Sequence, residues 1–493
     1  MIFNSLDFVI FIIIVFVMYW SLNSKMKFQN LFLLLSSYFF YCWWDWRFLF
    51  LLILVSVVNY TVGLKLYNKN NQSRKAWLLA GLIINILVLT YFKYFNFFVD
   101  SFIDAFSLID VDIQKPSLNI ILPLGISFYI FLSLSYIIDI YNNKLKAEKN
   151  IVNVLLSLSF FPIIFAGPIQ KPSSLLPQIR SKRIFKYEFA VDGLKQILWG
   201  LFMKVVIADK CALIVNNIFS DFNNYKSSSL VVGGVLFMIQ IYADFGGYSL
   251  IAIGVSRLLG FEINSNFRYP YFADNFPEFW KRWHISLTSW FRDYIFLPLS
   301  FFISRKIPAE RYFSINADLI IYMTGIVFTW LLTGLWHGAN LTFILWGLLN
   351  GMILVLYRIA KKNRRSLIKK LKKYNISSIL TAAESILTLI FILFLWIIFR
   401  SNNISEAFSY LSGILSMSGL SKPDMMILKN NRDLFILIAI FFLIEWIGRN
   451  QDYPIFSIFN KWKRPLRWVM YYSILICILW YAGNEQEFFY FQF

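Results

Sequence analysis

The chain has 493 residues, of which 58% are hydrophobic, 20% aromatic and 15% charged. A soluble core of this size needs far less apolar surface, so the composition excludes a soluble globular protein and indicates an integral membrane protein. The formal net charge of +20 would suggest nucleic-acid binding in a soluble protein. Here the basic residues lie mostly in short loops between apolar runs, and no soluble basic domain is present to carry that function.

Uncharged runs of membrane-spanning length recur along the chain. A helix needs roughly 20 apolar residues to cross about 30 Å of hydrocarbon. The run from Leu319 to Tyr357 is about twice that length, so it predicts two spans with a turn near its centre, where His337 lies. We expect an all-α, polytopic membrane protein with about 11–13 transmembrane helices. The other clear runs are residues 8–24, 48–64, 76–92, 116–138, 227–243 and 468–484.

Charges alternate between the loops in the way that marks membrane orientation. Lys25 and Lys27 follow the first run, and the largest basic cluster, at 361–373, follows the run that contains His337. The loop at 100–115 instead carries four aspartates and one lysine. Because cytoplasmic loops are enriched in Lys and Arg, this alternation supports about 11–13 spans with both termini outside. We expect a multi-pass protein of the plasma membrane.

Two proline-containing stretches, residues 158–179 and 269–300, break the helical pattern. Proline removes a backbone donor and clashes inside a helix. At membrane depth, irregular backbone persists only where protein or a water-filled cavity covers it. Both stretches therefore predict re-entrant or interfacial segments that line a cavity.

The chain contains two histidines, His284 and His337, and both lie in unusual local sequences. A positioned imidazole can take a proton from a hydroxyl and return it, and an ionisable group inside a membrane predicts a functional site. His337 could instead be a helix-packing residue, and His284 could belong to an ordinary aromatic and basic interface belt. No glycine-rich phosphate loop and no metal-ligand cluster is present, so we expect no bound cofactor and no metal.

Several residues around His337 have two interpretations. Asn340 could orient the imidazole or a substrate carbonyl, or it could start the next helix. Trp336 and its neighbours Trp330 and Trp346 could pack the bundle or form a platform for substrate. Gly334 and Gly338 would let backbone or substrate approach closely.

Five stretches resemble a known family, the membrane-bound O-acyltransferases, and within it the alginate O-acetyltransferase-like branch that modifies polysaccharide or peptidoglycan. The resemblance runs from about residue 120 to 350, and the C-terminal FFYFQF also fits it. This suggests a catalytic core at 120–350, flanked by N-terminal spans (1–95) and C-terminal spans (378–493) within a single membrane-embedded domain of residues 1–493. The stretches are LPLGISFYIFLSLSYIIDIY (122–141), FFPIIFAGPI (160–169), IQIYADFGGYSLIAIGVSRLLGF (239–261), FPEFWKRWHISLTSWFRDYIFLPL (276–299) and TGLWHGANLTFILWGLLNG (333–351).

The resemblance implies that His337 is the catalytic residue and that His284 is a second important position. It also implies a tunnel between a cytoplasmic thioester donor, acetyl-CoA, and an extracytoplasmic acceptor. An acceptor hydroxyl could attack the thioester directly, or the acyl group could pass by relay to an extracytoplasmic acetyltransferase partner. The relay is favoured because the sequence supplies no soluble outer domain with a Ser-His-Asp arrangement. Hydropathy alone would put His337 at an outer turn, but its neighbours carry no charge, so we expect the recessed position.

The charged residues near His284 are candidates for substrate binding. Lys281, Arg282 and Arg292 could hold coenzyme A phosphates or simply anchor the cytoplasmic face. Asp244 and Asp293 could orient a histidine or pair with cations. Because Arg292 and Asp293 are adjacent, they point to different faces if helical, so they are not an obvious pair.

Two alternatives remain open for the function. One is a D-alanyl, lipid or protein O-acyltransferase of the same family. The other is a proton-coupled transporter, which would also combine many spans, broken helices and a buried histidine.

Overall fold

The computed structural model describes residues 1–68, 72–107, 120–307, 310–312, 315–372, 377–416, 429–456, 462–483, 486 and 488. These residues are mainly helical, and the strands β1 (Arg311–Tyr312) and β2 (Ile315–Asn316) form a small antiparallel pair. The all-α fold expected from the sequence is confirmed. The chain divides into two compact units, which we call unit 1 (Met1–Ile197 and Tyr248–Asn264) and unit 2 (Leu198–Gly247 and Ser265–Phe493).

Unit 1 contains the N-terminal helices and the first of the two irregular stretches. Residues 160–170 have no regular helix and are buried throughout, so protein covers this backbone as membrane depth requires. Its helices are α1 (Leu6–Ser21), α2 (Met26–Cys42), α3 (Arg47–Tyr67), α4 (Arg74–Ser107), α5 (Ile126–Tyr141), α6 (Ile151–Ser159), α7 (Pro172–Arg180) and most of α8 (Tyr187–Leu201).

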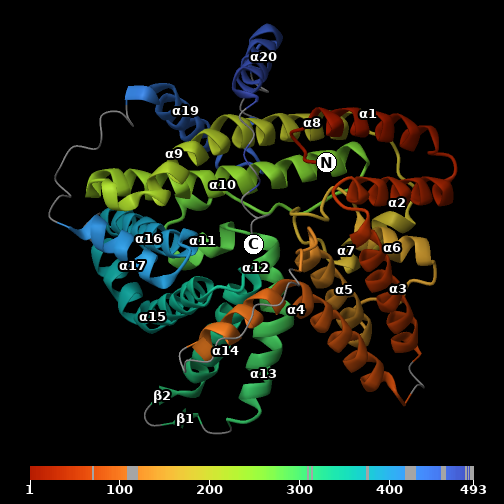
Figure 1. Ribbon diagram of the computed structural model, residues 1–493, viewed down its shortest axis with the longest axis horizontal. Coiled ribbons are helices and arrows are strands. Elements are labelled where there is room, and N and C mark those ends of the chain that lie inside the picture. Colours follow the sequence, from red (N-terminus) through yellow and green to blue (C-terminus); the bar gives the residue numbers. More distant parts are fainter. Residues whose placement is uncertain are drawn as a thin grey trace. The chain divides into compact units, whose positions relative to one another are not determined.

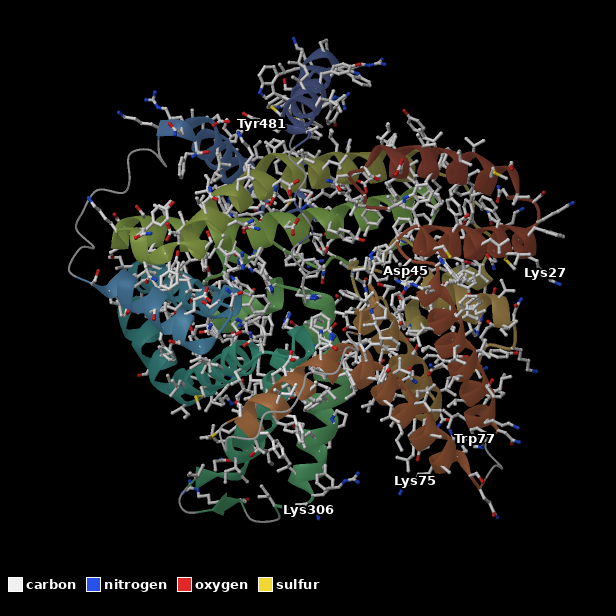
Figure 2. The ribbon with its side chains drawn as sticks, in the orientation of Figure 1. Lys27, Asp45, Lys75, Trp77, Lys306 and Tyr481 are labelled. Carbon is white, nitrogen blue, oxygen red and sulfur yellow. The ribbon has the colours of Figure 1, made fainter. Side chains whose placement is uncertain are left out.

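Charged residues at the ends of α3 and α4 in unit 1 belong to the alternating acidic and basic loops from which the membrane orientation was predicted. Asp45 lies just before α3, whereas Lys75 lies at the start of α4, and Figure 2 shows the two at opposite ends of this helix pair. This arrangement is the one expected of two neighbouring spans joined by a basic loop. The prediction of a loop over 100–115 is wrong for its first part, because α4 continues to Ser107. Residues 108–119 and many of the side chains of the basic cluster at 361–373 lie outside what the structure describes.

Unit 2 contains a long buried helix, a series of short helices and a helical hairpin. The long helix α10 (Ser227–Leu258) begins in unit 2 and its last turns belong to unit 1. The other helices are η1 (Phe202–Ala208), α9 (Asp209–Ser220), η2 (Phe222–Asn224), η3 (Pro270–Phe272), α11 (Phe276–Arg282), α12 (Ile285–Phe291), η4 (Arg292–Phe296), α13 (Leu297–Ser304), α14 (Ala317–His337), α15 (Leu341–Lys372), α16 (Ser377–Arg400), α17 (Ile404–Leu415), α19 (Arg432–Gly448), η6 (Pro454–Phe456) and α20 (Arg464–Tyr481).

Within the described ranges, six helices are long and apolar enough to cross a membrane: those at 47–67, 74–103, 227–258, 317–337, 341–361 and 378–400. Two further apolar helices, α1 and α5, have 16 residues each. The structure therefore confirms a multi-pass helical protein with fewer full-length candidate spans than the 11–13 expected. The difference arises because several apolar runs fold as shorter helices.

The apolar run from Leu319 to Tyr357 folds as predicted into two helices. α14 and α15, which are labelled in the lower left part of Figure 1, pack against each other, and residues 338–340 form the turn between them. The helices cross closely at Gly334, where any Cβ would overlap the carbonyl oxygen of Phe343. This close crossing places the end of α14, and with it His337, against the first turns of α15.

Candidate functional site

One cavity of about 330 Å³ lies within unit 2, and both histidines of the chain line it. Its walls come from α11, α12, η4, α14 and α15. α14 packs against η4, and α11 packs against α15, so the short helices and the hairpin enclose the same space. The cavity brings together four of the site residues predicted from the sequence: His284, His337, Lys281 and Arg292.

His337 is the last residue of α14 and is recessed, with 5% of its surface exposed. Its ring packs edge to face against Phe399 and Trp346, with centroids 5.0 and 5.1 Å away. The chain can turn here because Gly338 has no Cβ, which would overlap the ring of Phe343. The structure therefore agrees with the recessed position expected for His337, and the aromatic side chains around the ring fix its orientation.

His284 lies between α11 and α12 and is 1% exposed. Its backbone is in the left-handed region, with φ 42° and ψ 52°, a conformation that costs energy for a residue with a side chain and is often found at functional sites. Nδ1 lies 3.1 Å from Oδ1 of Asn266. His284 is outside the six candidate spans, and burial lowers its pKa from 6.5 to about 3. The ring is therefore neutral at physiological pH.

The cations predicted near His284 divide into two groups. Lys281 and Arg292 line the cavity while their side chains remain 72% and 60% exposed, so they stand where the cavity meets the surface. Arg282 does not line the cavity, because its guanidinium donates to Glu278 and to the carbonyl of Phe272.

Arg292 and Asp293, which the sequence did not mark as an obvious pair, form an ion pair. Arg292 Nε lies 2.8 Å from Asp293 Oδ1 in η4. The long arginine side chain folds back along the helix surface toward the neighbouring carboxylate, an arrangement that arguments based on helix faces do not consider.

Asp244 does not line the cavity but belongs to a buried ion cluster. The Lys204 ammonium lies 2.8 Å from carboxylate oxygens of both Asp244 and Asp209, and it also donates to the carbonyl of Gln486 at 3.1 Å. Sequence reasoning missed Lys204. Its position could have identified it, because Lys204 lies within the apolar segment LWGLFMKVVIA, where a charged side chain needs a partner.

Asn340 and Trp336 also lie outside the cavity lining. Asn340 Oδ1 accepts from the backbone N–H of Thr342 at 3.0 Å, so it caps the start of α15, which is one of its two predicted interpretations. Trp336 is buried with its ring 4.8 Å from that of His337 and 6.0 Å from that of His284. It therefore packs beside both imidazoles, behind the cavity wall.

Tryptophans form most of the aromatic wall. Trp280 contacts Trp330 and Trp346 with centroid distances of 4.4 and 5.7 Å, and all three line the cavity. Packing and cavity lining are therefore combined in the same rings, rather than being alternatives as the sequence suggested. Trp283, which sits on Trp396 at 4.9 Å, extends the cluster beside His284.

Asn266 is a site residue that sequence reasoning did not find. It lies 18 positions before His284, is 1% exposed, and contacts the imidazole directly. No local pattern marks it, since its role depends on the tertiary approach of residues 266–268 to residues 282–285.

Among the described residues, no group of three or more His, Cys, Asp or Glu side chains has the arrangement of a metal site.

Comparison with known proteins identifies the family. A sequence model of the membrane-bound O-acyltransferase family (MBOAT) matches residues 143–380. The chain is 35% identical to the probable alginate O-acetylase AlgI of Pseudomonas syringae, over 83% of this chain and 74% of the relative. It is 32% identical to the peptidoglycan O-acetyltransferase of Helicobacter pylori, over 80% of this chain and 75% of the relative.

A more distant relative extends the range of chemistry within the family. The chain is 28% identical to the teichoic acid D-alanyltransferase of Bacillus subtilis, over 50% of this chain and 62% of the relative. The region matched by the family model, residues 143–380, includes both histidines and the entire lining of the cavity. The chain is a membrane O-acyltransferase and belongs to the membrane-bound O-acyltransferase family.

Proposed function

We propose that the protein takes an acetyl group from cytoplasmic acetyl-CoA and transfers it toward a hydroxyl of an extracytoplasmic polysaccharide or peptidoglycan, with His337 as general base. The observation that carries the proposal is that both histidines share one cavity with Lys281 and Arg292. The similarity to an alginate O-acetylase and to a peptidoglycan O-acetyltransferase supports the acetyl group and the class of acceptor.

The proposed chemistry begins at the imidazole of His337. A ring nitrogen takes the proton of the acceptor hydroxyl as its oxygen attacks the thioester carbonyl. The resulting tetrahedral intermediate collapses, the carbon–sulfur bond breaks, and the thiolate leaves. The imidazolium then returns the proton to the thiolate, so the products are the acetyl ester and free coenzyme A. The aromatic rings around His337 hold the imidazole in place and limit access of water.

Lys281 and Arg292 are proposed to bind the phosphates of coenzyme A. Both are cationic and partly exposed where the cavity meets the surface, while the rest of the lining is mainly apolar and aromatic. Phosphate oxygens bind strongly to guanidinium and ammonium groups. This would leave the thioester to enter the cavity toward the histidines.

The hydroxyl that accepts the acetyl group is proposed to belong to an extracytoplasmic partner, which passes the group to the polymer, and the membrane is proposed to be the plasma membrane. The described residues form helical units without a separate soluble domain that could perform the second transfer. D-alanyl transfer is the second candidate, because a teichoic acid D-alanyltransferase is among the relatives.

The test is thioester consumption by the purified protein in nanodiscs, with labelled acetyl-CoA and an extracytoplasmic partner plus polymer acceptor. Wild type should release coenzyme A and form acetylated product. His337→Gln should lose about a hundredfold or more of kcat while its thermal unfolding stays close to that of wild type. A folded His337→Gln that keeps full activity would contradict the role of His337. A wild type that consumes neither acetyl-CoA nor a D-alanyl thioester with partners present would contradict the proposed substrates.

A second arm of the test addresses the phosphates. Lys281→Ala and Arg292→Ala should each raise the KM for acetyl-CoA about two- to fivefold, because the lost contacts are partly solvent-exposed. Neither should change the KM for acetyl-pantetheine, which lacks the nucleotide phosphates. Lys306→Ala is the matched control, since Lys306 lies beyond the end of α13, is exposed and does not line the cavity (Figure 2). Equal KM increases for both substrates would contradict phosphate binding.

A further inference from the structure

The contact between His284 and Asn266 distinguishes the two ring nitrogens of the imidazole. Oδ1 of Asn266 lies 3.1 Å from Nδ1 of His284. The same atom accepts from the backbone N–H of Ser286 at 3.2 Å and from the Ser286 hydroxyl at 2.8 Å. A backbone N–H can only donate, so the Asn266 atom that faces it must be the amide oxygen and not the amide nitrogen.

This assignment decides where the imidazole proton lies. An amide oxygen has no hydrogen to give, so Nδ1 of His284 can bond to it only by donating its own proton. A neutral imidazole carries one N–H, and burial keeps this ring neutral because it lowers the pKa to about 3. Nε2 of His284 therefore carries a lone pair.

The backbone around Asn266 holds this arrangement in place. The carbonyl of Asn266 accepts from the N–H of Ile285 at 2.8 Å, and the N–H of Arg268 donates to the carbonyl of Arg282 at 2.9 Å. These two bonds fasten residues 266–268 alongside the turn that contains His284. They also hold His284 in its left-handed backbone conformation, which no local preference would maintain.

The rings around His284 restrict its rotation. Phe245 packs edge to face at 4.7 Å, Phe267 lies parallel at 6.3 Å, and Trp336 lies at 6.0 Å. Rotating the imidazole to exchange its nitrogens would require these rings to move and would break the bond to Asn266. His284 also lines the cavity, so a ring held in one tautomer borders the space of the proposed transfer.

We propose that Asn266 is a positioning residue that holds His284 as the Nδ1–H tautomer, so that Nε2 acts as an acceptor during acyl transfer. Nε2 can then accept a hydrogen bond or a proton from a substrate O–H or N–H. It cannot donate to the thioester carbonyl, which excludes a role for His284 as an oxyanion donor in its neutral form. The role in transfer rests on the proposed function, whereas the tautomer does not.

The tautomer can be measured directly because the chain has two histidines. Protein labelled with ¹⁵N in the histidine rings gives four ring-nitrogen resonances in nanodiscs, and a His337→Gln background leaves the two of His284. We expect a protonated Nδ1 and an unprotonated Nε2 for His284 at pH 7.5. Asn266→Ala should shift the population toward Nε2–H, the form that predominates in an unconstrained histidine. A protonated Nε2 in wild-type protein would overturn the proposal, as would an Nδ1–H tautomer that persists in Asn266→Ala.

Two variants separate positioning from folding. Asn266→Asp keeps an oxygen acceptor, so the Nδ1–H tautomer and at least part of the activity should return. Ser286→Ala removes another donor to the same oxygen and should leave the tautomer unchanged, which makes it the matched control. If Asn266→Ala does not fold, Asn266→Asp and the wild-type spectrum still decide the tautomer.

Kinetics then test the role in catalysis. Asn266→Ala, assayed with acetyl-CoA, should lose about tenfold or more of kcat, with less than about a threefold change in KM. A shifted tautomer with unchanged kcat would overturn the catalytic part of the proposal. If wild type consumes no thioester while its spectrum shows Nδ1–H, the proposed function fails and the tautomer assignment stands.

Discussion

His284 combines three unusual features at one residue: a left-handed backbone, nearly complete burial and a direct amide partner. Each of the first two costs free energy by itself. The hydrogen bonds that Asn266 makes to the ring, to Ser286 and to the backbone of Ile285 offset these costs. Such a concentration of unfavourable features is typical of residues retained for chemistry rather than for stability.

The lowered pKa of His284 predicts a pH dependence of stability. The folded ring has a pKa of about 3 and the unfolded ring about 6.5, so protonation favours the unfolded state. Stability from the neutral ring is complete above pH 6.5 and is lost as the pH falls toward 3, by up to about 1.4 kcal/mol per pH unit. Thermal unfolding in detergent should show a larger fall in Tm between pH 7.5 and 5 for wild type than for His284→Gln. Equal slopes for the two proteins would contradict a depressed pKa.

At the scale of elements, the hairpin of α14 and α15 is the part of the fold that positions the reaction. The two helices approach closely at Gly334 and Gly347, where each Cβ would overlap a backbone carbonyl of the other helix. A backbone neighbour cannot move aside as a side chain can. The position of His337, three residues after Gly334, therefore depends on this crossing.

Gly334→Ala should push the two helices apart. We expect a loss of about 1–3 kcal/mol in stability and a fall in kcat that exceeds the change in KM, because the end of α14 is displaced. Gly413→Ala in α17 is the matched control: its new Cβ would meet the end of the Leu230 side chain, which can move, and alanine is a better helix former. Thermal unfolding and the acetyl-CoA assay measure both effects. A Gly334→Ala variant as stable and active as Gly413→Ala would show that the crossing is not critical.

At the scale of the whole molecule, the volume of the cavity limits the acyl group. About 330 Å³ lies at the low end of the range for ligand pockets, and it must hold the thioester and the acceptor hydroxyl together. Because the donor and the acceptor share this space, we expect turnover to fall as the acyl chain lengthens. The protein should be selective for acetyl and similarly small groups.

Acyl-CoA donors of increasing chain length test this limit. Turnover by wild type should fall steadily from acetyl to butyryl and should be lost for octanoyl. Leu354 lines the cavity from α15, so Leu354→Ala should extend the accepted length by removing part of the wall. Leu356→Ala is the control on the same helix, because Leu356 is 63% exposed and does not line the cavity. Turnover of octanoyl-CoA by wild type at the rate of acetyl-CoA would contradict a limit set by the cavity.

The sequence predicted those features that depend on composition and local pattern. The apolar run around His337 predicted both helices and the turn between them, and the scarcity of histidine singled out the two residues that share the cavity. Features that depend on tertiary contacts were not predictable. Asn266 and Lys204 meet their partners through chain segments that approach only in the folded protein, and Arg292 turns back toward Asp293 in a way that helical periodicity does not describe.

The placement of both histidines on one cavity has a practical consequence. No other imidazole exists anywhere in the chain, so every reaction of the protein with a histidine-selective alkylating reagent occurs at this cavity. The extent of alkylation therefore measures how open the cavity is, and protection by a bound molecule measures occupancy without any engineered label. The wild-type protein thus carries its own chemical reporter of access to the site.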